Sequence, residues 1–320
     1  MRFVTFLADS GPRAGVVEGD TIRALPRETT LQRLVEAGTE ALPDAGAAAL
    51  RRSSLVVPLS TAQLFAPLPA PPTIRDYMTF EEHVEGVAML AGADVAPRWY
   101  EAPAFYFTHP GVVRGPLEDV PVPPGCELFD LELEVAAVIG AGGSDLLPEE
   151  AASKIAGYML MNDWSARDLQ FEEMTVRLGP AKGKDGATSL GPYLVTPDEL
   201  IQGDAGSSPD APLTARINGE DIGHANLAGM SFTFGQMIAY ASRGSIVRAG
   251  DIFGSGTCGG GCLAELWGRF GRNHHAPLRP GDVVELDGGP LGHQRSRVVP
   301  GAAGIEPSVF RAKTALGLLS

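Results

Sequence analysis

The feature that most constrains the fold is a succession of short strand-like runs separated by turn residues. Strands do not alternate regularly with helices, as they would in a parallel α/β sheet. The chain's 40 glycines and 26 prolines suit a turn-rich β fold. The clearest runs are residues 105–108, 131–139, 158–162, 213–217, 251–254 and 283–286.

A few local signals add detail to this β-rich pattern. The Asn218-Gly219 pair predicts a two-residue hairpin turn, because both turn positions need positive φ. Helices are expected to be few, the clearest at 165–174 and 234–242. The predicted fold class is therefore α+β, mainly β with some helix.

The N-terminal part is predicted to form a small β-rich unit. Short strand-like runs at 2–7, 14–17 and 21–24 precede a helical pattern at 31–37. Prolines crowd the segment 65–72, where missing amide donors favour an extended, stiff connector. The sequence thus predicts two domains, residues 1–65 and 66–320.

Bulk composition excludes several classes of partner. The net charge of -14 argues against nucleic acid and anionic membrane surfaces, which attract basic proteins. No apolar stretch is long enough to span a membrane, and the N-terminus lacks a secretory pattern. Three cysteines are too few for a disulfide framework and suggest reduced thiols. We expect a cytoplasmic protein that acts on a small molecule.

Two glutamates in the run 131–139 are the most informative pair of side chains. Side chains alternate between the faces of a strand, so Glu132 and Glu134 share one face. They could form a solvated acidic face. However, the apolar run 135–139 indicates a buried strand, on which two such carboxylates would repel each other unless a cation lay between them.

A second segment runs from an apolar strand into a predicted helix. Asp163, Arg167, Gln170 and Met174 follow at the spacing of one helical face. The alternative is an ordinary helix start, capped by Asp163 or Ser165, with a surface pair between Asp163 and Arg167. Taken alone, this segment favours the alternative.

Two further segments carry residues of possible chemical use. Asp76 and His83 follow the proline-rich connector, either two helical turns apart or on a loop and a helix. The segment 254–265 contains a literal G-x-G-x-x-G, but its surroundings are strand-like rather than a βαβ unit. We interpret that match as chance, although such a loop lets backbone amides approach a ligand closely.

Together with residues 178–192, these segments resemble the fumarylacetoacetate hydrolase family in residue type, order and spacing. The resemblance covers roughly residues 71–299, and the N-terminal unit looks like the small accessory domain of longer members. It implies a catalytic domain of the mixed β-sandwich roll type. We expect a homodimer, because C2 symmetry is the commonest form of homo-oligomer.

The resemblance implies a divalent-cation site. Glu132, Glu134 and Asp163 match the family's metal ligands, and Asp76 matches the further ligand of longer members. Ligation by oxygen alone suits Mg²⁺, Ca²⁺ or Mn²⁺ rather than zinc, and we expect Mg²⁺ first.

The resemblance also assigns catalytic and substrate-binding positions. His83 aligns with the general base, and Glu265 with the carboxylate that orients it. Lys184 fits the family spacing to Gly191-Pro192 better than Lys182 does. The positions that contact substrate or stabilise developing negative charge are Arg167, Lys184, Gln170 and Thr257.

Two departures from the family pattern affect the expected substrate. Met78 and Met174 stand where members that cleave fumarylacetoacetate carry tyrosines. Thioethers remove two phenolic hydrogen-bond donors and leave a more apolar pocket. The arginine that binds a distal carboxylate in those members has no counterpart in 84–92. Fumarylacetoacetate itself is therefore not the expected substrate.

The predicted function is hydrolytic cleavage of a carbon–carbon bond in a β-diketo or acylpyruvate-type acid, through a metal-bound enolate. The nearest alternative is a decarboxylase or isomerase of a keto acid, because these reactions pass through the same kind of enolate. A third is a non-catalytic, metal-stabilised binding protein. The presence of both His83 and Glu265 argues against it, since a binder needs no base with an orienting carboxylate.

Overall fold

The computed structural model describes residues 1–9, 11–200, 208–305 and 307–312. Its strands are β1 (Arg2–Ala8), β2 (Gly11–Glu18), β3 (Thr21–Ala24), β4 (Val56–Pro58), β5 (Leu64–Phe65), β6 (Ile74–Tyr77), β7 (Phe105–Thr108), β8 (Val113–Arg114), β9 (Val120–Pro121), β10 (Phe129–Asp130), β11 (Leu133–Ile139), β12 (Ile155–Asp163), β13 (Ser165–Ala166), β14 (Thr188–Leu190), β15 (Leu194–Val195), β16 (Pro212–Ile217), β17 (Glu220–Asn226), β18 (Ile252–Gly254), β19 (Val283–Asp287) and β20 (His293–Val299).

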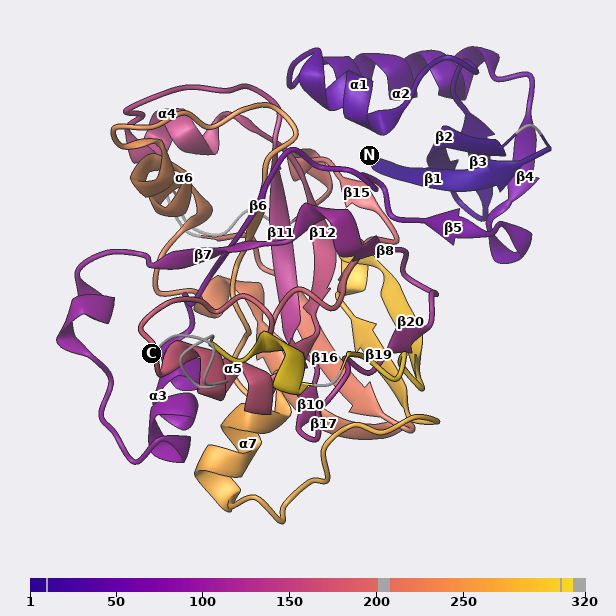
Figure 1. Ribbon diagram of the computed structural model, residues 1–320. Coiled ribbons are helices and arrows are strands. Elements are labelled where there is room, and N and C mark those ends of the chain that lie inside the picture. The colour runs from indigo at the N-terminus through magenta and orange to yellow at the C-terminus, as the bar shows by residue number, and fades with distance from the viewer. Residues whose placement is uncertain (10, 201–207, 306, 313–320) are drawn as a thin grey trace.

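The helices lie outside the sheets (Figure 1). The α-helices are α1 (Leu31–Glu36), α2 (Ala41–Arg52), α3 (Glu81–Leu90), α4 (Pro148–Ala152), α5 (Arg167–Met174), α6 (Phe234–Ser242) and α7 (Leu263–Phe270). The 3₁₀ helices are η1 (Leu59–Thr61), η2 (Pro97–Tyr100), η3 (Pro110–Val112), η4 (Pro197–Glu199), η5 (Leu227–Gly229), η6 (Gly289–Leu291) and η7 (Pro307–Phe310).

One large mixed sheet forms the backbone of the molecule. Its main path runs β4-β3-β2-β1-β15-β12-β11-β18-β6-β7, with β5, β8 and β14 attached beside it. The N-terminal strands join this sheet because β1 pairs with β15. The predicted division at residue 65 falls at the end of β5, and strands on both sides of it belong to one sheet.

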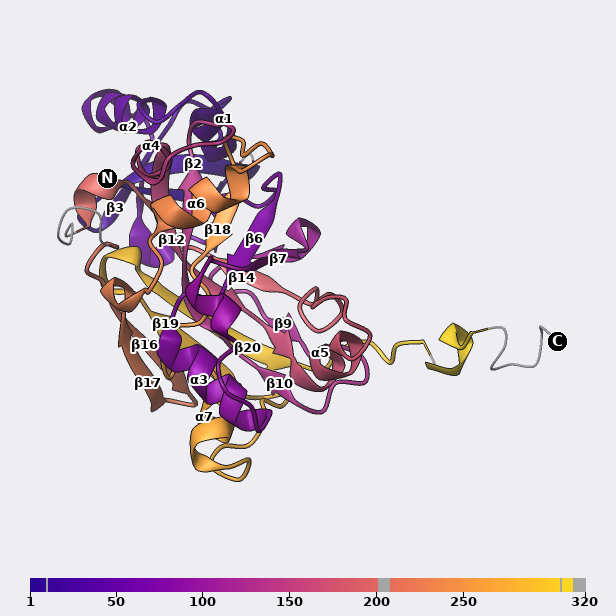
Figure 2. The ribbon, with the colours of Figure 1, turned by 90° about the vertical axis from the view of Figure 1, so that its left-hand side faces the viewer.

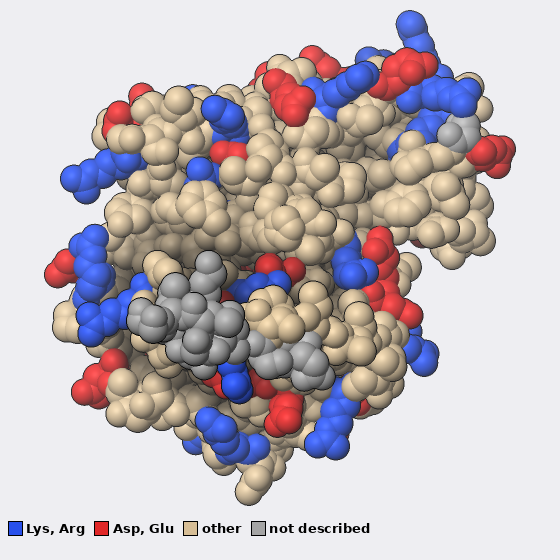
Figure 3. All heavy atoms as spheres, in the orientation of Figure 1, with Lys and Arg blue, Asp and Glu red and all other residues tan. Residues whose placement is uncertain are grey.

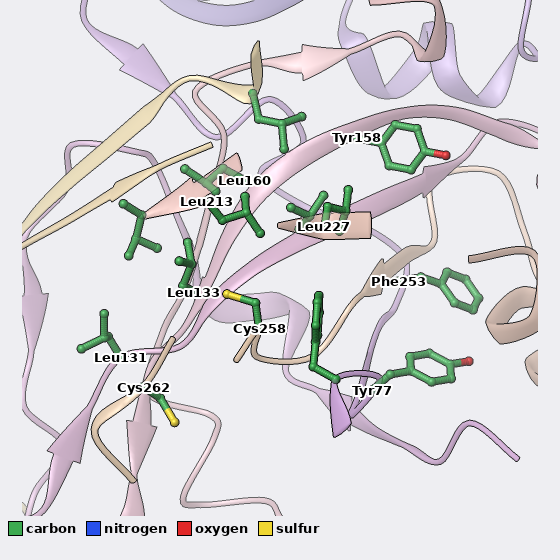
Figure 4. Close-up of a cluster of buried hydrophobic side chains, with 14 of the residues drawn as sticks. Tyr77, Leu131, Leu133, Tyr158, Leu160, Leu213, Leu227, Phe253, Cys258 and Cys262 are labelled. Atoms are coloured by element: carbon green, nitrogen blue, oxygen red, sulfur yellow. The ribbon is translucent and has the colours of Figure 1, made fainter. Parts of the chain in front are cut away.

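A second sheet, β17-β16-β19-β20-β9, covers one face of the large one. Strand β11 is buried on both faces, which explains its unbroken apolar run. Leu133 and Val135 face a core shared with Leu213 of the second sheet (Figure 4). Ala136 and Val138 pack on the opposite face against the N-terminal unit. The predicted fold class is confirmed: sheets in a mainly β sandwich, with helices around them.

Several predicted elements appear at or close to their expected positions. Strand β7 and helix α6 match 105–108 and 234–242. The hairpin turn between β16 and β17 has φ of 53° at Asn218 and 84° at Gly219. Helix α2 was not predicted. Its proline, Pro43, is compatible with a helix because it lies in the first turn, where a missing amide costs no helical hydrogen bond.

Two predicted boundaries were wrong, for one reason. The helix expected at 165–174 begins at Arg167, because Ser165 and Ala166 form β13 and pair with β10. The strand expected at 131–139 begins only at Leu133, because the residues just before it, in β10, pair with β13. Asp163 is consequently the last residue of β12 and not a helix cap.

The thiols and the surface charges of the described residues can be located. The three cysteines are free, and Cys258 and Cys262 lie among buried apolar side chains (Figure 4). None of the helices in the described part is both long and apolar enough to cross a bilayer. On the face seen in Figure 3, basic side chains are interspersed with acidic ones rather than gathered into a continuous basic surface.

Candidate active site

A pocket of about 180 Å³ opens where β6, α3 and α5 meet the ends of β11 and β12. This volume accommodates a small organic acid and is too small for a dinucleotide. Nine of the residues singled out in the sequence line it: Asp76, Met78, His83, Glu132, Arg167, Gln170, Met174, Lys184 and Thr257. The other three, Glu134, Asp163 and Glu265, are buried next to this wall.

Four carboxylates converge beneath the pocket: Asp76 from β6, Glu134 from β11, Asp163 from β12, and Glu132 from the link before β11. Asp76, Glu132 and Glu134 each offer an oxygen, and these atoms lie within 4.8 Å of one another. Asp163 lies beside them, because β12 pairs with β11 and the Asp163 amide donates to the Glu132 carbonyl at 3.3 Å. The structure therefore brings together all four predicted metal ligands.

A glycine between two strands makes room for this convergence. Strand β18 lies between β11 and β6, and Gly254 is the register partner of Asp76. A Cβ atom at Gly254 would lie 2.3 Å from Asp76 Oδ1. Asp76 can reach toward Glu134 because the intervening strand carries no side chain at this point. The glycine-rich segment thus serves close packing, and α7 begins only at Leu263, after it.

The carboxylates differ in charge preference. Burial raises the pKa of Asp76, raises that of Asp163 to about 7, and raises that of Glu134 well above its ordinary value, with further upward pressure on Glu134 from Asp76. Glu132 is also buried, yet the adjacent Arg167 and Lys184 hold its pKa well below the usual range. With all four carboxylates ionised, the cluster would carry more negative charge than Arg167 and Lys184 balance, and the raised pKa values reflect that excess.

Two buried carboxylate oxygens in this cluster, Glu134 Oε2 and Asp163 Oδ1, have no hydrogen-bond partner among the described residues. Buried polar atoms are normally paired, so two such unpaired oxygens on adjacent strands fit a site that binds a cation. A divalent cation would supply both the partner and the charge. With oxygen donors alone, the residues fit Mg²⁺, Mn²⁺ or Ca²⁺.

Arg167 and Lys184 are buried cations that share Glu132. The Arg167 guanidinium donates to Asp130 at 2.8 Å and to Glu132 at 2.7 Å. Lys184 Nζ donates to Glu132, and to Asp163 at 2.9 Å. The Asp163–Arg167 surface pair, the alternative considered for this segment, does not form, because Asp163 ends a strand and faces Lys184.

Lys184 occupies the position that the family spacing favoured. Its side chain is buried, whereas Lys182 is exposed and pairs with Asp185. The Glu173 carboxylate positions the turn before Lys184 by accepting from the backbone amides of 181, 182 and 183 at 2.7, 2.7 and 3.0 Å. A helix residue thereby fixes the loop that carries the pocket's lysine.

The predicted dyad is present beside the carboxylates. His83, in the first turn of α3, has Nδ1 3.5 Å from Glu265 Oε2 of α7. Glu265 is held by the Gly260 amide at 2.8 Å and by Arg269 Nε at 2.9 Å. Cys262 Sγ also lies 3.7 Å from His83 Nδ1, a neighbour that was not predicted.

A glycine contact between α3 and α7 sets the distance within the dyad. The two helices lie side by side (Figure 2). A Cβ at Gly268 would lie 1.9 Å from the Gly86 carbonyl oxygen, and one at Gly86 would lie 2.3 Å from Glu265 Cγ. Only glycine at both positions permits this close approach.

Gly268→Ala is therefore expected to push α7 away from α3 and separate Glu265 from His83. We expect destabilisation by about 1–3 kcal/mol, as for other overpacked sites, together with a fall in kcat. Thermal unfolding and steady-state kinetics measure the two effects. Gly229→Ala is the control, because its Cβ would make only ordinary contact with Phe80 at 3.7 Å. Native values for both variants would contradict this account of the helix contact.

Sequence reasoning missed two polar residues of the site. Tyr106 on β7 donates its hydroxyl to Asp76 Oδ2 at 2.8 Å and also bonds Asp163. The Asp130 carboxylate accepts hydrogen bonds from Arg167 and from the backbone amides of Leu263 and Ala264. It therefore connects the start of α7 to the pocket. The position of Asp130 two residues before Glu132 was a usable signal, whereas nothing local distinguishes Tyr106.

The remaining predicted residues lie in the pocket wall. Gln170 accepts from Arg167 Nη1 at 3.1 Å, and Thr257 Oγ1 is 3.5 Å from Glu134 Oε1. Met78 and Met174 line the same pocket and are 42% and 46% exposed. They therefore lie toward its opening, away from the buried carboxylates.

Comparison with known protein families identifies the class of protein to which this fold and site belong. Residues 73–299 match the model described as fumarylacetoacetate (FAA) hydrolase, C-terminal. Residues 1–67 match a separate model, Rv2993c-like, N-terminal. The chain belongs to the fumarylacetoacetate hydrolase family, as the motifs implied.

Individual relatives are identical to it at about a third of the aligned positions. It is 34% identical to 2,4-didehydro-3-deoxy-L-rhamnonate hydrolase of Sphingomonas sp. (strain SKA58), over 58% of this chain and 61% of that protein. It is 31% identical to fumarylacetoacetase of Caenorhabditis elegans, over 83% of this chain and 77% of the relative. The chain thus spans less than two thirds of the first of these relatives.

Solved structures share the same fold. A probable 2-hydroxyhepta-2,4-diene-1,7-dioate isomerase from Mycobacterium abscessus has a TM-score of 0.72 and 26% identity, covering 94% of this chain and 100% of that one. A maleylpyruvate hydrolase from Sphingobium sp. SYK-6, solved with manganese(II) and pyruvate, has a TM-score of 0.70 and 23% identity, with the same coverage.

Proposed function

We propose that the protein is a divalent-cation-dependent hydrolase that cleaves a carbon–carbon bond in a β-diketo acid of the acylpyruvate type. One observation carries the proposal: a buried carboxylate cluster with two unpartnered oxygens lies in the same pocket as a histidine–glutamate pair. The pocket's size suits such a substrate. The maleylpyruvate hydrolase neighbour, crystallised with manganese(II) and pyruvate, supports the cation and the substrate class.

The reaction consumes one water and yields two acids. The water oxygen bonds to the acyl carbonyl carbon, and the bond from that carbon to the central CH₂ breaks. Its electron pair passes to the CH₂ carbon, which takes up a proton and becomes the methyl group of pyruvate. The acyl group leaves as a carboxylic acid, so the atoms balance.

The cation would be held by the four carboxylates of the cluster, Asp76, Glu132, Glu134 and Asp163. We propose Mg²⁺ as the first candidate for this ion, and Mn²⁺ or Ca²⁺ as the second. When bound, it supplies a Lewis acid that polarises the keto group and stabilises the negative charge of the enolate.

His83 is assigned the role of general base. With Nδ1 directed at Glu265, its Nε2 is left to take a proton from water. Glu265 cannot turn away, because Gly260 and Arg269 hold it. Arg167 and Lys184 place positive charge beside the pocket, where the attacked carbonyl becomes an oxyanion.

A second candidate is isomerisation or decarboxylation of a keto acid in the same pocket. It is supported by 32% identity to oxaloacetate tautomerase fahd2 of Xenopus laevis, over 58% of this chain and 55% of that protein. Hydrolysis is favoured because a base with a fixed orienting carboxylate suits the activation of water. A non-catalytic binding protein would have no use for this pair. The homodimer and the cytoplasmic location remain predictions.

A substrate screen tests the proposal. Acylpyruvates, oxaloacetate and unsaturated keto acids are incubated with Mg²⁺ or Mn²⁺, with and without chelator, and the products are identified. We expect acylpyruvates to give pyruvate and a second acid only when the cation is present. Release of CO₂ would indicate decarboxylation, and a product of unchanged mass isomerisation. Substrates recovered unchanged would favour the binding protein.

A further inference from the structure

The wall of the pocket changes in character along two helices. On α5, Arg167 is 3% exposed and contacts the carboxylates, whereas Phe171 and Met174 are 36% and 46% exposed. From Arg167 to Met174 the eight residues of α5 rise by about 10 Å along the helix axis. On α3, His83 is followed one turn later by Val87, which also lines the pocket. The buried end is therefore charged, and the wall toward the opening is made of carbon and sulfur.

Most other lining residues also present apolar surface to the pocket, although Tyr77 and Ala264 are buried rather than near the opening. The remaining lining residues without a charge or a free polar side chain are Tyr77, Met78, Ala104, Phe105, Gly179, Pro180 and Ala264. Tyr77 belongs to this set because its hydroxyl is already bonded to the Met237 carbonyl at 2.9 Å. Gln170 and Thr257 lie close to the charged end, bonded to Arg167 and Glu134.

The lysine and arginine of the pocket wall are already engaged. Among the described lining residues these are Arg167 and Lys184, and both donate to carboxylates of the buried end. A carboxylate at the outer end of a substrate would meet no cation among the described residues that line this part of the pocket. It would lose its hydration against thioether and ring surfaces without a compensating hydrogen bond, which is strongly unfavourable.

We propose that the acyl group of the substrate, the part released as the second acid, is uncharged and apolar. The inference rests on the proposed function and deepens it: the substrate is an acylpyruvate with an alkyl or aryl tail rather than one with a second carboxylate. The keto-acid end lies at the buried carboxylates and their cations. The tail lies along Phe171, Met174 and Met78.

Two substrates of matched size test the proposal. Pentanoylpyruvate and glutarylpyruvate differ only in that the terminal methyl group is replaced by a carboxylate. We expect kcat/KM to favour pentanoylpyruvate by roughly 100-fold or more, as when a pocket leaves a polar group unpaired. Equal values, or a preference for glutarylpyruvate, would overturn the inference.

A substitution at the opening supplies the missing cation. Met174→Arg is expected to shift the kcat/KM ratio toward glutarylpyruvate by roughly 10-fold or more. Met89→Arg is the matched control, because Met89 is a 54% exposed methionine on α3 outside the pocket wall, and its ratio is expected to stay native. An unchanged ratio in Met174→Arg would show that the tail does not pass this side chain.

Binding separates this inference from the proposed reaction. In His83→Gln, calorimetry with each uncleaved substrate and Mg²⁺ is expected to show tighter binding of pentanoylpyruvate. If the native protein cleaves neither substrate, the proposed hydrolysis fails, and this binding preference alone decides the inference about the tail. Tighter binding of glutarylpyruvate, or no binding of either, would refute it.

Discussion

His83→Gln is expected to lower kcat by roughly 100- to 10,000-fold, the range in which a general base contributes. Glutamine fills similar space and can still donate to Glu265, but it cannot accept a proton from water. His83 is only 4% exposed and lies 3.5 Å from Glu265, so the variant removes the proton acceptor without opening the pocket. Steady-state kinetics on the best acylpyruvate of the screen measures the effect.

Two controls separate loss of the base from loss of the fold. Circular dichroism and thermal unfolding of His83→Gln should resemble those of the native protein. His224→Gln replaces a histidine whose side chain is 65% exposed on β17, and it should retain native kcat. A His83→Gln protein with more than half of native activity would remove His83 from the mechanism and leave the role of Glu265 without a basis.

Glu132→Gln is expected to lower the stability of the metal-free protein, whereas Glu134→Gln is expected to leave it unchanged or raise it. Glu132 is the shared partner of two buried cations, and its loss leaves both short of a counter-charge. Breaking a buried ion pair from one side costs about 3–5 kcal/mol. Burial first, and then the neighbouring Asp76, raise the pKa of Glu134 and disfavour its ionised form, so a neutral glutamine there should leave stability unchanged or raise it.

Glu134→Gln is also expected to weaken binding of the divalent cation. Mg²⁺ or Mn²⁺ should raise the melting temperature of the native protein, because a ligand that binds only the folded state stabilises it. The rise should disappear with chelator and be largely lost in Glu134→Gln, together with activity. Calorimetric titration with Mn²⁺ measures the affinity directly. A native thermal shift in Glu134→Gln would exclude this carboxylate from the cation site.

Much of the outline could be predicted from local sequence. Helix α6 was placed correctly because a capping box marks its start, and strand β7 because it is a short run of aromatic residues, which favour strands. The asparagine–glycine turn was also readable, because few other residues adopt its conformation. The predicted starts of the strand and the helix were wrong near Glu132 and Ser165. There the short strands β10 and β13 pair with each other and interrupt the pattern expected for longer elements.

The candidate site depended on the family motifs more than on residue chemistry. Alternation on a strand placed Glu132 and Glu134 on one face, but it could not exclude a solvated surface. Periodicity even suggested the wrong partner for Arg167, which bonds Asp130 and Glu132 rather than Asp163. Local pattern describes which face a side chain occupies and not what the rest of the chain places against that face.

The sequence by itself determined the mainly β class, the family and the set of residues with chemical potential. The tertiary structure decided how they meet: Asp76 reaches the glutamates past Gly254, and Glu265 reaches His83 where Gly86 meets Gly268. It also directed the apolar Met78 and Met174 to the pocket's opening. These contacts join segments far apart in the chain, and they follow from packing between elements, which no local periodicity records.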